Sequence, residues 1–484
     1  MARLSSCAVS GFLALTAANA IAALPEEVSQ ALRRAEVSLE DVSVFVQDVE
    51  SSAPLLAFNA DRPMNPASTM KLLTTYAALE SLGPAHTWKT EVYAEGPIKD
   101  GVLKGNLVIK GHGDPRLDLQ SFWMLTRQLR LTGLKDIRGD LVLDDSYFAP
   151  ANGDPGGFDN RPYRAYNVGP EALMVHYRVV ELRITPEPEK NTVRVVADPV
   201  PGPLTLVNRL RLTRGPCNEW RDALNAEIRG APDPASVRLT GTFSAQCGEK
   251  SYLLNLFDNS RYIHGVFREL WKEQGGRFSG GVHRGEWSGG AGPLASHESA
   301  PLGDIVRDIN KHSNNVMARQ LLLTLGAELV SVPGTVEGGR IAIQRWLSEK
   351  GMIFSELVIE NGSGLSRAER ISARHMGELL LAAWNSPYMP EFIASMPIPA
   401  MDGTMKKRLS GSGLAGRAHI KTGLLEGVKT LAGYILDRRG RRLAVVAFVN
   451  SPRAGATEAA LDALLDWAYQ GPPAAPPARE DGKP

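Results

Sequence analysis

The segment Pro66-Ala67-Ser68-Thr69-Met70-Lys71 opens the clearest helix that the sequence predicts, over residues 69–81 and ending at Gly83-Pro84. Positions three apart lie on one face of a helix, so the amine of Lys71 can reach the hydroxyl of Ser68. A serine hydroxyl is a poor nucleophile until a base takes its proton, and a lysine can be that base only when neutral. Burial, a nearby cation and a helix N-terminus each disfavour the charged amine. Ser68 and Lys71 are a candidate nucleophile and base, although roughly one or two Ser-X-X-Lys sequences arise by chance in a chain of this length.

A second motif, Ser313-Asn314-Asn315, lies on a helix that we predict over residues 301–325. Ser313 could relay a proton between the lysine and a leaving amine, and Asn315 could hold a substrate amide and the lysine in place. Standing alone, the motif would be a polar patch that caps or interrupts a helix.

A third motif, Lys421-Thr422-Gly423, lies on a short strand predicted over residues 419–422, at a sheet edge. Lys421 supplies a positive charge and Thr422 a hydroxyl donor, which together suit a carboxylate. Gly423 would let a ligand approach the strand closely. Standing alone, this motif would be a strand that ends at a glycine turn.

Elements predicted near the two ends of the chain can share one sheet. The expected strands cover residues 42–49, 55–59, 419–422, 430–436 and 443–450, and the expected helices cover residues 25–36 and 457–469. A sheet assembled from both ends implies a discontinuous domain over residues 23–88 and 288–470. The fold class that we expect is α/β (α+β), with an antiparallel sheet flanked by helices and a long insertion.

The insertion, residues 89–287, is predicted to be mostly β, as one or two inserted domains. Its expected strands cover residues 107–110, 140–143, 179–185, 192–197, 237–242 and 252–257. One helix, over residues 119–131, interrupts this pattern, and Asp118 is placed to cap its N-terminus.

The composition and the chain ends narrow the class of protein. The 484 residues include 54 basic and 53 acidic ones, and the net charge of +1 argues against nucleic acid or an anionic membrane as partner. Residues 1–22 are typical of a signal peptide, with Arg3, an apolar run and Ala20-Ile21-Ala22 as a cleavage site. The run is far shorter than the ~20 residues that span a bilayer. The tail, residues 471–484, is rich in Pro and Ala and is expected to be disordered.

Two cysteines remain once residues 1–22 are removed, Cys217 and Cys247. An even pair in a secreted chain predicts a disulfide, and closing this loop would contribute ~3–4 kcal/mol in the chain-entropy model. Two unpaired thiols are the alternative. A zinc site is disfavoured because no His lies near the pair at ligand spacing.

Together the three motifs resemble those of the penicillin-recognising serine enzymes. The first gap is 313 − 68 = 245 residues and the second is 421 − 313 = 108 residues. This spacing resembles the class C low-molecular-mass penicillin-binding proteins, the D-alanyl-D-alanine carboxypeptidase/endopeptidase family, whose extra domains are inserted between the first two motifs. Four further segments are similar to segments of that family: Asn361-Gly362-Ser363-Gly364-Leu365-Ser366-Arg367, Asp402-Gly403-Thr404-Met405, Gly113-Asp114-Pro115 and the stretch from Asp140 to Phe148.

The resemblance implies a penicillin-recognising transpeptidase-like domain that cuts D-alanyl peptide bonds through a serine acyl-enzyme. The roles that it implies are nucleophile for Ser68, base for Lys71, completion of the catalytic set for Ser313 and Asn315, and binding of the terminal carboxylate for Lys421 and Thr422. The oxyanion hole would be the backbone N–H groups of Ser68 and Leu424, where the family usually has Thr or Ser at the second position. An Asp of the inserted domain contacts the amine of a diaminopimelate-type side chain in the family. Asp144 matches that position best and Asp145 second, with a plain surface carboxylate as the alternative.

The resemblance implies no cofactor and no metal ion. The partners that it implies are peptidoglycan stem peptides and cross-links, with β-lactam antibiotics as covalent inhibitors. With the signal peptide, it predicts a periplasmic enzyme without a membrane anchor.

A serine β-lactamase is the nearest rival, but the Glu-X-X-X-Asn segment of class A enzymes is missing between the second and third motifs. A non-catalytic cell-wall-binding protein is disfavoured because all three motifs are intact. The choice between carboxypeptidase and endopeptidase stays open.

Overall fold

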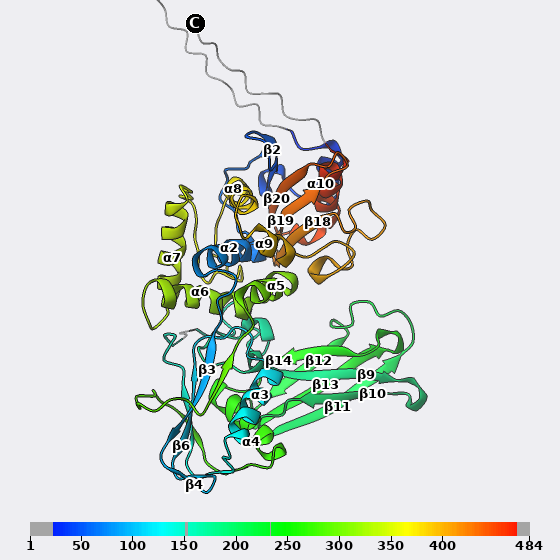
Figure 1. Cartoon of the computed structure of the whole chain (residues 1–484). Helices are drawn as coiled ribbons and strands as arrows, with labels where there is room; N and C mark the ends of the chain where they lie inside the picture. Colours follow the sequence, from blue (N-terminus) through cyan, green and yellow to red (C-terminus); the bar gives the residue numbers. More distant parts are fainter. Residues whose placement is uncertain (1–22, 151–152, 233, 472–484) are drawn as a thin grey trace, which may run out of the picture.

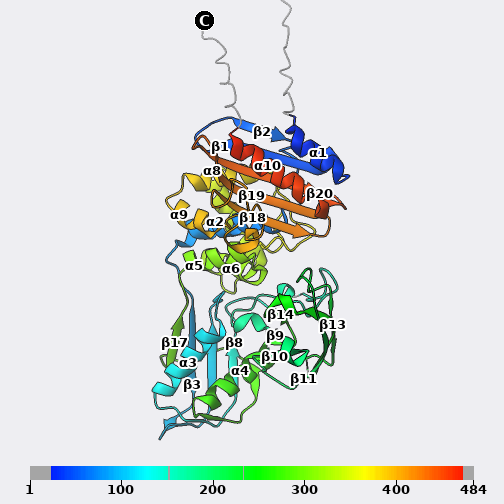
Figure 2. The same ribbon diagram turned by 90° about the vertical axis from the view of Figure 1, so that its right-hand side faces the viewer.

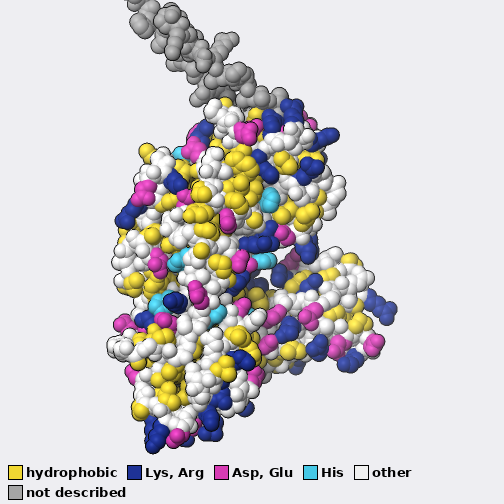
Figure 3. Space-filling model, viewed as in Figure 1, with side chains coloured by type: hydrophobic (Ala, Val, Ile, Leu, Met, Phe, Trp, Pro, Cys, Tyr) yellow, Lys and Arg dark blue, Asp and Glu magenta, His cyan; other side chains and the backbone are white. Residues whose placement is uncertain are grey.

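The chain folds into an upper part that combines both ends of the sequence and a lower part made from its middle (Figures 1 and 2). The structure is a computed structural model that describes residues 23–150, 153–232 and 234–471. The predicted signal peptide and nearly all of the predicted disordered tail lie outside these residues. Within them, no helix has both the length and the apolar character needed to cross a bilayer. Basic and acidic side chains are interspersed over the face seen in Figure 3, which shows a notch between the upper part and the projecting lower lobe.

The upper part is centred on an antiparallel sheet whose strand order is β18-β19-β20-β1-β2. The strands are β1 (Val42–Asp48), β2 (Pro54–Phe58), β18 (Ala418–Leu425), β19 (Val428–Leu436) and β20 (Arg442–Asn450). Strand β1 pairs with β20, Val44 lying opposite Ala447, so the first and last strands of the sequence are neighbours. The edge position predicted for the Lys421 strand is confirmed, because β18 has a neighbour on one side only.

Helices cover both faces of this sheet, which confirms the predicted antiparallel sheet flanked by helices. Successive side chains of a strand point to opposite faces. Accordingly, Val44 of β1 packs with Leu32 and Leu461 of the terminal helices, whereas Phe45 packs in the core on the other face. The terminal helices are α1 (Glu26–Arg34) and α10 (Glu458–Gln470). Those on the other face include α2 (Met70–Leu82), α5 (Leu302–His312), α6 (Asn315–Leu329), α7 (Val336–Glu349), α8 (Ala373–Trp384) and α9 (Met389–Ser395).

The single helix predicted over residues 301–325 is two helices, so that prediction was wrong. Helix α5 ends at His312, and the next residue, Ser313, has a left-handed backbone (φ 55°). Asn314 then caps α6, because its side-chain oxygen accepts a hydrogen bond from the Met317 N–H at 3.1 Å. The motif therefore lies at a break between two helices, where the left-handed backbone of Ser313 departs from helical geometry.

The lower part is rich in strands. A five-stranded sheet has the order β16-β8-β6-β3-β17, two three-stranded sheets have the orders β10-β9-β14 and β11-β13-β12, and short strands pair in the order β15-β7-β5-β4. The bounds are β3 (Lys89–Glu95), β4 (Ile98–Lys99), β5 (Val102–Leu103), β6 (Asn106–Gly111), β7 (Asp136–Ile137), β8 (Leu141–Asp144), β9 (Val180–Glu187), β10 (Thr192–Asp198), β11 (Leu204–Thr213), β12 (Leu224–Arg229), β13 (Ala235–Ser244), β14 (Lys250–Leu254), β15 (Arg277–Phe278), β16 (Val282–Arg284) and β17 (Ala295–Glu298).

Two α-helices lie among the described residues of this part, where the sequence predicted one. The predicted helix is α3 (Leu119–Leu131), and Asp118 caps it by accepting a hydrogen bond from the Ser121 N–H at 2.8 Å. The second is α4 (Asn259–Glu273), which buries Tyr262, Phe267 and Trp271 along one face. Strands β11 and β12 were also absent from the prediction.

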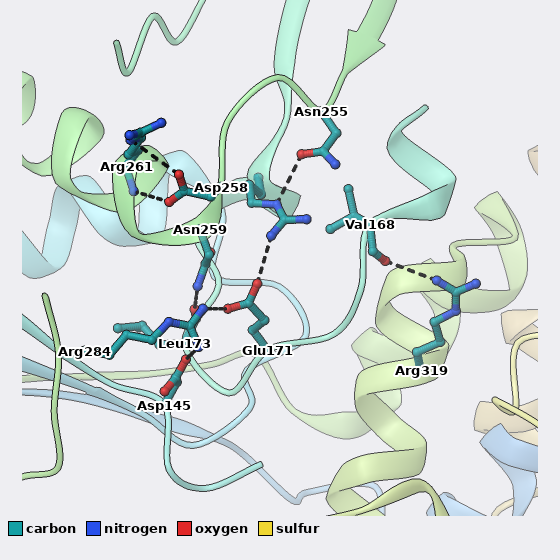
Figure 4. A network of polar contacts seen from close by, with 11 residues as sticks. Asp145, Val168, Glu171, Leu173, Asn255, Asp258, Asn259, Arg261, Arg284 and Arg319 are labelled. Atoms are coloured by element: carbon teal, nitrogen blue, oxygen red, sulfur yellow. Dashed lines mark hydrogen bonds and ion pairs between the residues drawn. The ribbon is translucent and has the colours of Figure 1, made fainter. Parts of the chain in front are cut away.

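A segment at residues 168–173 of the lower part bridges to the upper part through side-chain contacts (Figure 4). The Val168 carbonyl accepts a hydrogen bond from Arg319 of α6 at 3.2 Å. Three residues further on, Glu171 pairs with Arg178 at 2.9 Å and with Arg284 at 2.6 Å. The segment is therefore fixed by charges of the lower part at one end and by a helix of the upper part at the other.

The predicted disulfide between Cys217 and Cys247 is present, with the two Cα atoms 4.7 Å apart. It joins the loop between β11 and β12 to the turn that follows β13. Cys247 is buried in the core of the lower part, where the bond cross-links neighbouring connections.

Candidate active site

Ser68 lies in a tight turn at the start of α2. A single 3-10 turn (Ala67–Thr69) precedes the helix, and Ala67 has φ 44°, which an L-residue rarely adopts. Surrounding hydrogen bonds hold this turn: Asn65 accepts from the Ala67 N–H at 2.9 Å, and Thr430 of β19 donates to the Pro66 carbonyl at 2.8 Å. Ser68 itself is partly exposed, so a substrate can reach its hydroxyl.

Lys71 lies one turn further along α2, completely buried behind Ser68. Its Nζ is 2.9 Å from Ser68 Oγ and 2.7 Å from Asn315 Oδ1, and it also donates to the Ser363 carbonyl. Burial, and then the Lys421 cation, lower the pKa of Lys71 well below its usual value, and Glu369 opposes this. A buried amine with a depressed pKa, within hydrogen-bond distance of a hydroxyl, can accept that hydroxyl's proton.

Lys421 faces Ser313 across the same site. Its Nζ donates to Ser313 Oγ at 2.9 Å and to the Thr422 carbonyl at 2.7 Å, and the side chain is completely buried. Burial lowers the pKa of Lys421 to about 7. The three sequence motifs therefore converge, with the serine of the second motif next to the lysine of the third.

The rest of β18 borders the nucleophile. Thr422 is hydrogen-bonded to Thr404 of the Asp-Gly-Thr segment at 2.8 Å, and Leu424 is 66% exposed. A Cβ on Gly423 would lie 2.8 Å from Ser68 N and 2.3 Å from Thr430 Oγ1. Glycine is required here because the strand packs against the Ser68 turn. The sequence suggested the close approach of a ligand as the reason for Gly423, but the atoms nearest to it belong to the protein itself.

Asp144 is not among the residues that the fold brings to this cluster. It is completely buried at the end of β8, and its carboxylate accepts from Lys110 (2.8 Å), Ser146 (2.6 Å) and the Trp287 N–H (2.8 Å). A carboxylate enclosed in this way is not free to bind a substrate amine. The runner-up, Asp145, is ion-paired with Arg284.

A cavity of about 720 Å³ lies beside the cluster, between the two parts of the molecule. Asn361 connects the two, since it lines the cavity and accepts from Ser363, the residue whose carbonyl binds Lys71, at 2.6 Å. Asp154 and Arg367 supply a carboxylate and a guanidinium to the walls, and the guanidinium lies 5.0 Å from the centre of the Phe158 ring. Sequence reasoning missed Asp154, although it is one of several carboxylates in the insertion.

Two further residues of the cluster also escaped the sequence analysis as site residues. Ser363 and Thr404 belong to segments that the family resemblance had singled out, and both contact motif residues. Glu369 follows the first of these segments and is completely buried. No spacing rule predicts a buried carboxylate at that place in a loop.

Comparison with known families supplies the classification. The model of the D-Ala-D-Ala carboxypeptidase 3 (S13) family matches residues 24–470, which is nearly all of the described chain. The chain belongs to this family. The resemblance inferred from the motifs is thereby confirmed.

Individual relatives agree with the S13 assignment. The D-alanyl-D-alanine carboxypeptidase of Actinomadura sp. (strain R39) is 29% identical over 85% of this chain and 78% of its own length. The D-alanyl-D-alanine carboxypeptidase DacB of Haemophilus influenzae is 25% identical over 86% of this chain and 87% of its own. The crystal structure of penicillin binding protein 4 from H. influenzae has the same fold, with a TM-score of 0.74 at 24% identity, covering 91% of this chain and 99% of that one.

Proposed function

We propose that this S13 family member is a peptidoglycan D-alanyl-D-alanine carboxypeptidase that acts through an acyl-enzyme on Ser68. The observation that carries the proposal is the contact between the partly exposed Ser68 hydroxyl and the buried Lys71 amine, 2.9 Å apart. The same hydroxyl would be acylated by β-lactams. The signal-peptide pattern of residues 1–22 supports a periplasmic location.

In the first step, Lys71 takes the Ser68 proton as the oxygen attacks the carbonyl of the penultimate D-alanine. The negative charge on the resulting tetrahedral oxygen would be stabilised by the backbone N–H groups of Ser68 and Leu424. The carbon–nitrogen bond then breaks, and the proton that Lys71 had taken from Ser68 passes through Ser313 to the leaving amine. Water hydrolyses the ester with the roles reversed, which releases the shortened peptide and restores Ser68.

The substrate's terminal carboxylate would bind at β18. Thr422 and Thr404 place two hydroxyls 2.8 Å apart at this edge, and Lys421 lies behind them. Because Lys421 also donates to Ser313, its charge acts on both the carboxylate and the proton path. Leu424 adds an exposed apolar surface where the family usually has a hydroxyl.

The stem-peptide side chain would occupy the 720 Å³ cavity, with Asp154 taking its amine. Asp154 is exposed and lines this cavity, whereas Asp144 is completely enclosed. We expect Asp154→Asn to raise KM roughly tenfold for an amine-bearing stem peptide, the cost of one charge-assisted hydrogen bond. Acetylation of that amine should raise KM of the wild type but not of the variant. Asp159, which binds Tyr166 at 2.7 Å, gives a matched Asp159→Asn control. An unchanged KM in Asp154→Asn would exclude the assignment.

Digestion of purified muropeptides tests the proposed activity directly. We expect the full chain to remove one alanine from uncross-linked pentapeptide monomers, seen by mass spectrometry as loss of one residue. The same digest with cross-linked dimers shows whether the enzyme is also an endopeptidase, because cleavage there yields two monomers. If wild-type protein that takes up a fluorescent penicillin left both substrates intact, the carboxypeptidase assignment would be refuted.

A further inference from the structure

Glu369 is a buried carboxylate that the proposed mechanism leaves without a role. Its side chain is completely enclosed, and Oε1 accepts the N–H groups of three consecutive residues, Glu360 (3.2 Å), Asn361 (3.0 Å) and Gly362 (2.9 Å). Its second oxygen, Oε2, is equally buried and has no hydrogen-bond partner among the described residues. Enclosing a carboxyl group in this way is costly, so its presence at this place requires an explanation.

The turn that Glu369 holds is the one that contacts Lys71. The Gly362 carbonyl accepts from Thr74 of α2 at 2.7 Å, and the next carbonyl, of Ser363, accepts from Lys71 Nζ. Gly364 (φ +80°) follows, and a Cβ there would lie 1.9 Å from the Ala67 carbonyl oxygen. The turn is therefore clamped between Glu369 on one side and the Ser68 turn on the other, which fixes the position of the Ser363 carbonyl.

Charged groups of both signs among the described residues act on the Lys71 amine. Lys421 from β18 and Arg319 from α6 lower the pKa of Lys71, whereas Glu369 raises it. Burial raises the pKa of Glu369 itself, and its three N–H donors and Lys71 oppose that. The neutral groups that contact Lys71 are Ser68, Asn315 and the Ser363 carbonyl.

We propose that Glu369 is a positioning residue for acylation: it fixes the turn that orients Lys71, and its negative charge sets the pH range in which Lys71 accepts the Ser68 proton. This rests on the proposed function, in which Lys71 is the base.

The sign of the expected effect follows from the charge. Acylation requires neutral Lys71, so its rate rises as the pH passes through the Lys71 pKa. A carboxylate whose charge acts on the amine favours the ammonium form and moves this rise to higher pH. Removing the charge should therefore move the rise to lower pH.

The test is the pH profile of the second-order rate of acylation by a fluorescent penicillin. Glu369→Gln keeps an oxygen acceptor for the three N–H groups and removes the charge. We expect the rise of its acylation rate with pH, the acid limb of the profile, to lie about one pH unit below that of the wild type. At a pH on this limb, the variant's rate as a fraction of its own plateau should be roughly tenfold higher than the wild type's. Glu369→Asp keeps the charge and should keep the wild-type limb even if its plateau is lower. Glu356→Gln, which removes a carboxylate that accepts the Ser372 N–H at 2.8 Å, is the matched control.

The outcomes separate the two proposals. The role of Glu369 would be overturned if the acid limb of Glu369→Gln stayed at the wild-type position. It would also be overturned if Glu369→Asp, which keeps the charge, shifted its acid limb as far as Glu369→Gln does. If the Gln variant does not fold, Glu369→Asn is measured in its place and interpreted in the same way. Normal acylation by a folded Lys71→Arg variant would instead exclude Lys71 as the base on which this proposal rests. Wild-type protein that is acylated by penicillin but releases no D-alanine would overturn the proposed function, whatever the pH profiles show.

Discussion

Replacing Ser68 by Ala should abolish the covalent adduct with a fluorescent penicillin and reduce D-alanine release by at least about 10⁴-fold. The acyl-enzyme needs an oxygen at this position, and the alanine methyl group cannot form the ester. The fold should survive, because Ser68 is partly exposed and its side chain contacts Lys71 without filling the core. Gel fluorescence after denaturation measures the adduct, and peptide mass mapping of the wild type should place it on Ser68.

The control for this experiment is Ser348→Ala, which removes the hydroxyl of an exposed serine on α7. It should label at the wild-type rate. Thermal unfolding of Ser68→Ala close to that of the wild type shows that the loss is chemical. Labelling that persists in Ser68→Ala would mean that another residue is the nucleophile.

The upper sheet could be predicted from sequence because its strands carry strong local signals. Val42–Asp48 and Arg442–Asn450 are rich in β-branched residues, and they pair although almost four hundred residues separate them in sequence. The resemblance of the three motifs, in their order and spacing, to those of a known family implied that they share one site. Helix α4 has a capping Asp258 and an apolar face, so its signals were also in the sequence and were overlooked.

The break at Ser313 had a weaker local signal, the polar run Ser313-Asn314-Asn315, which on its own suggested a cap or an interruption of the helix. Leu302–Leu329 keeps a helical pattern of apolar residues on both sides of the break, which favours one continuous helix. Ser313 adopts its left-handed backbone where its hydroxyl meets Lys421, a residue 108 positions further on. A conformation that accompanies a tertiary contact in this way cannot be deduced from local periodicity.

The choice among carboxylates was limited in the same way. The sequence pointed to Asp144 and did not single out Asp154. The folded chain shows that Asp144 is enclosed by Lys110, Ser146 and Trp287, whereas Asp154 lines the cavity. Glu369 has the charge of an ordinary surface residue, and its burial depends on the turn formed by residues 360–362. Burial and partner identity are properties of the assembled fold, so sequence spacing does not reveal them.

Replacing Lys71 by Arg should lower the rate of penicillin acylation by about 10²–10⁴-fold, the usual contribution of a general base. Arginine keeps the positive charge, but its guanidinium does not give up a proton at working pH, so it cannot accept one from Ser68. The existing site favours a neutral amine there, because burial and Lys421 both lower the pKa of Lys71. Stopped-flow acylation of the purified variant measures the effect.

Because Lys71 is completely buried, the larger guanidinium could also disturb packing, so Lys71→Met is measured beside it. Methionine fills a similar volume without any basic group, and the two variants should be equally slow if the missing base is the cause. Lys429→Arg is the matched control. Lys429 lies on β19, next to strand β18, and pairs with Glu458 at 3.0 Å. The Lys429→Arg variant should be acylated at the wild-type rate. Near-normal acylation in a folded Lys71→Arg variant would exclude Lys71 as the base. Lys421 would then be the candidate to accept the Ser68 proton, because burial lowers its pKa to about 7 and it contacts Ser313.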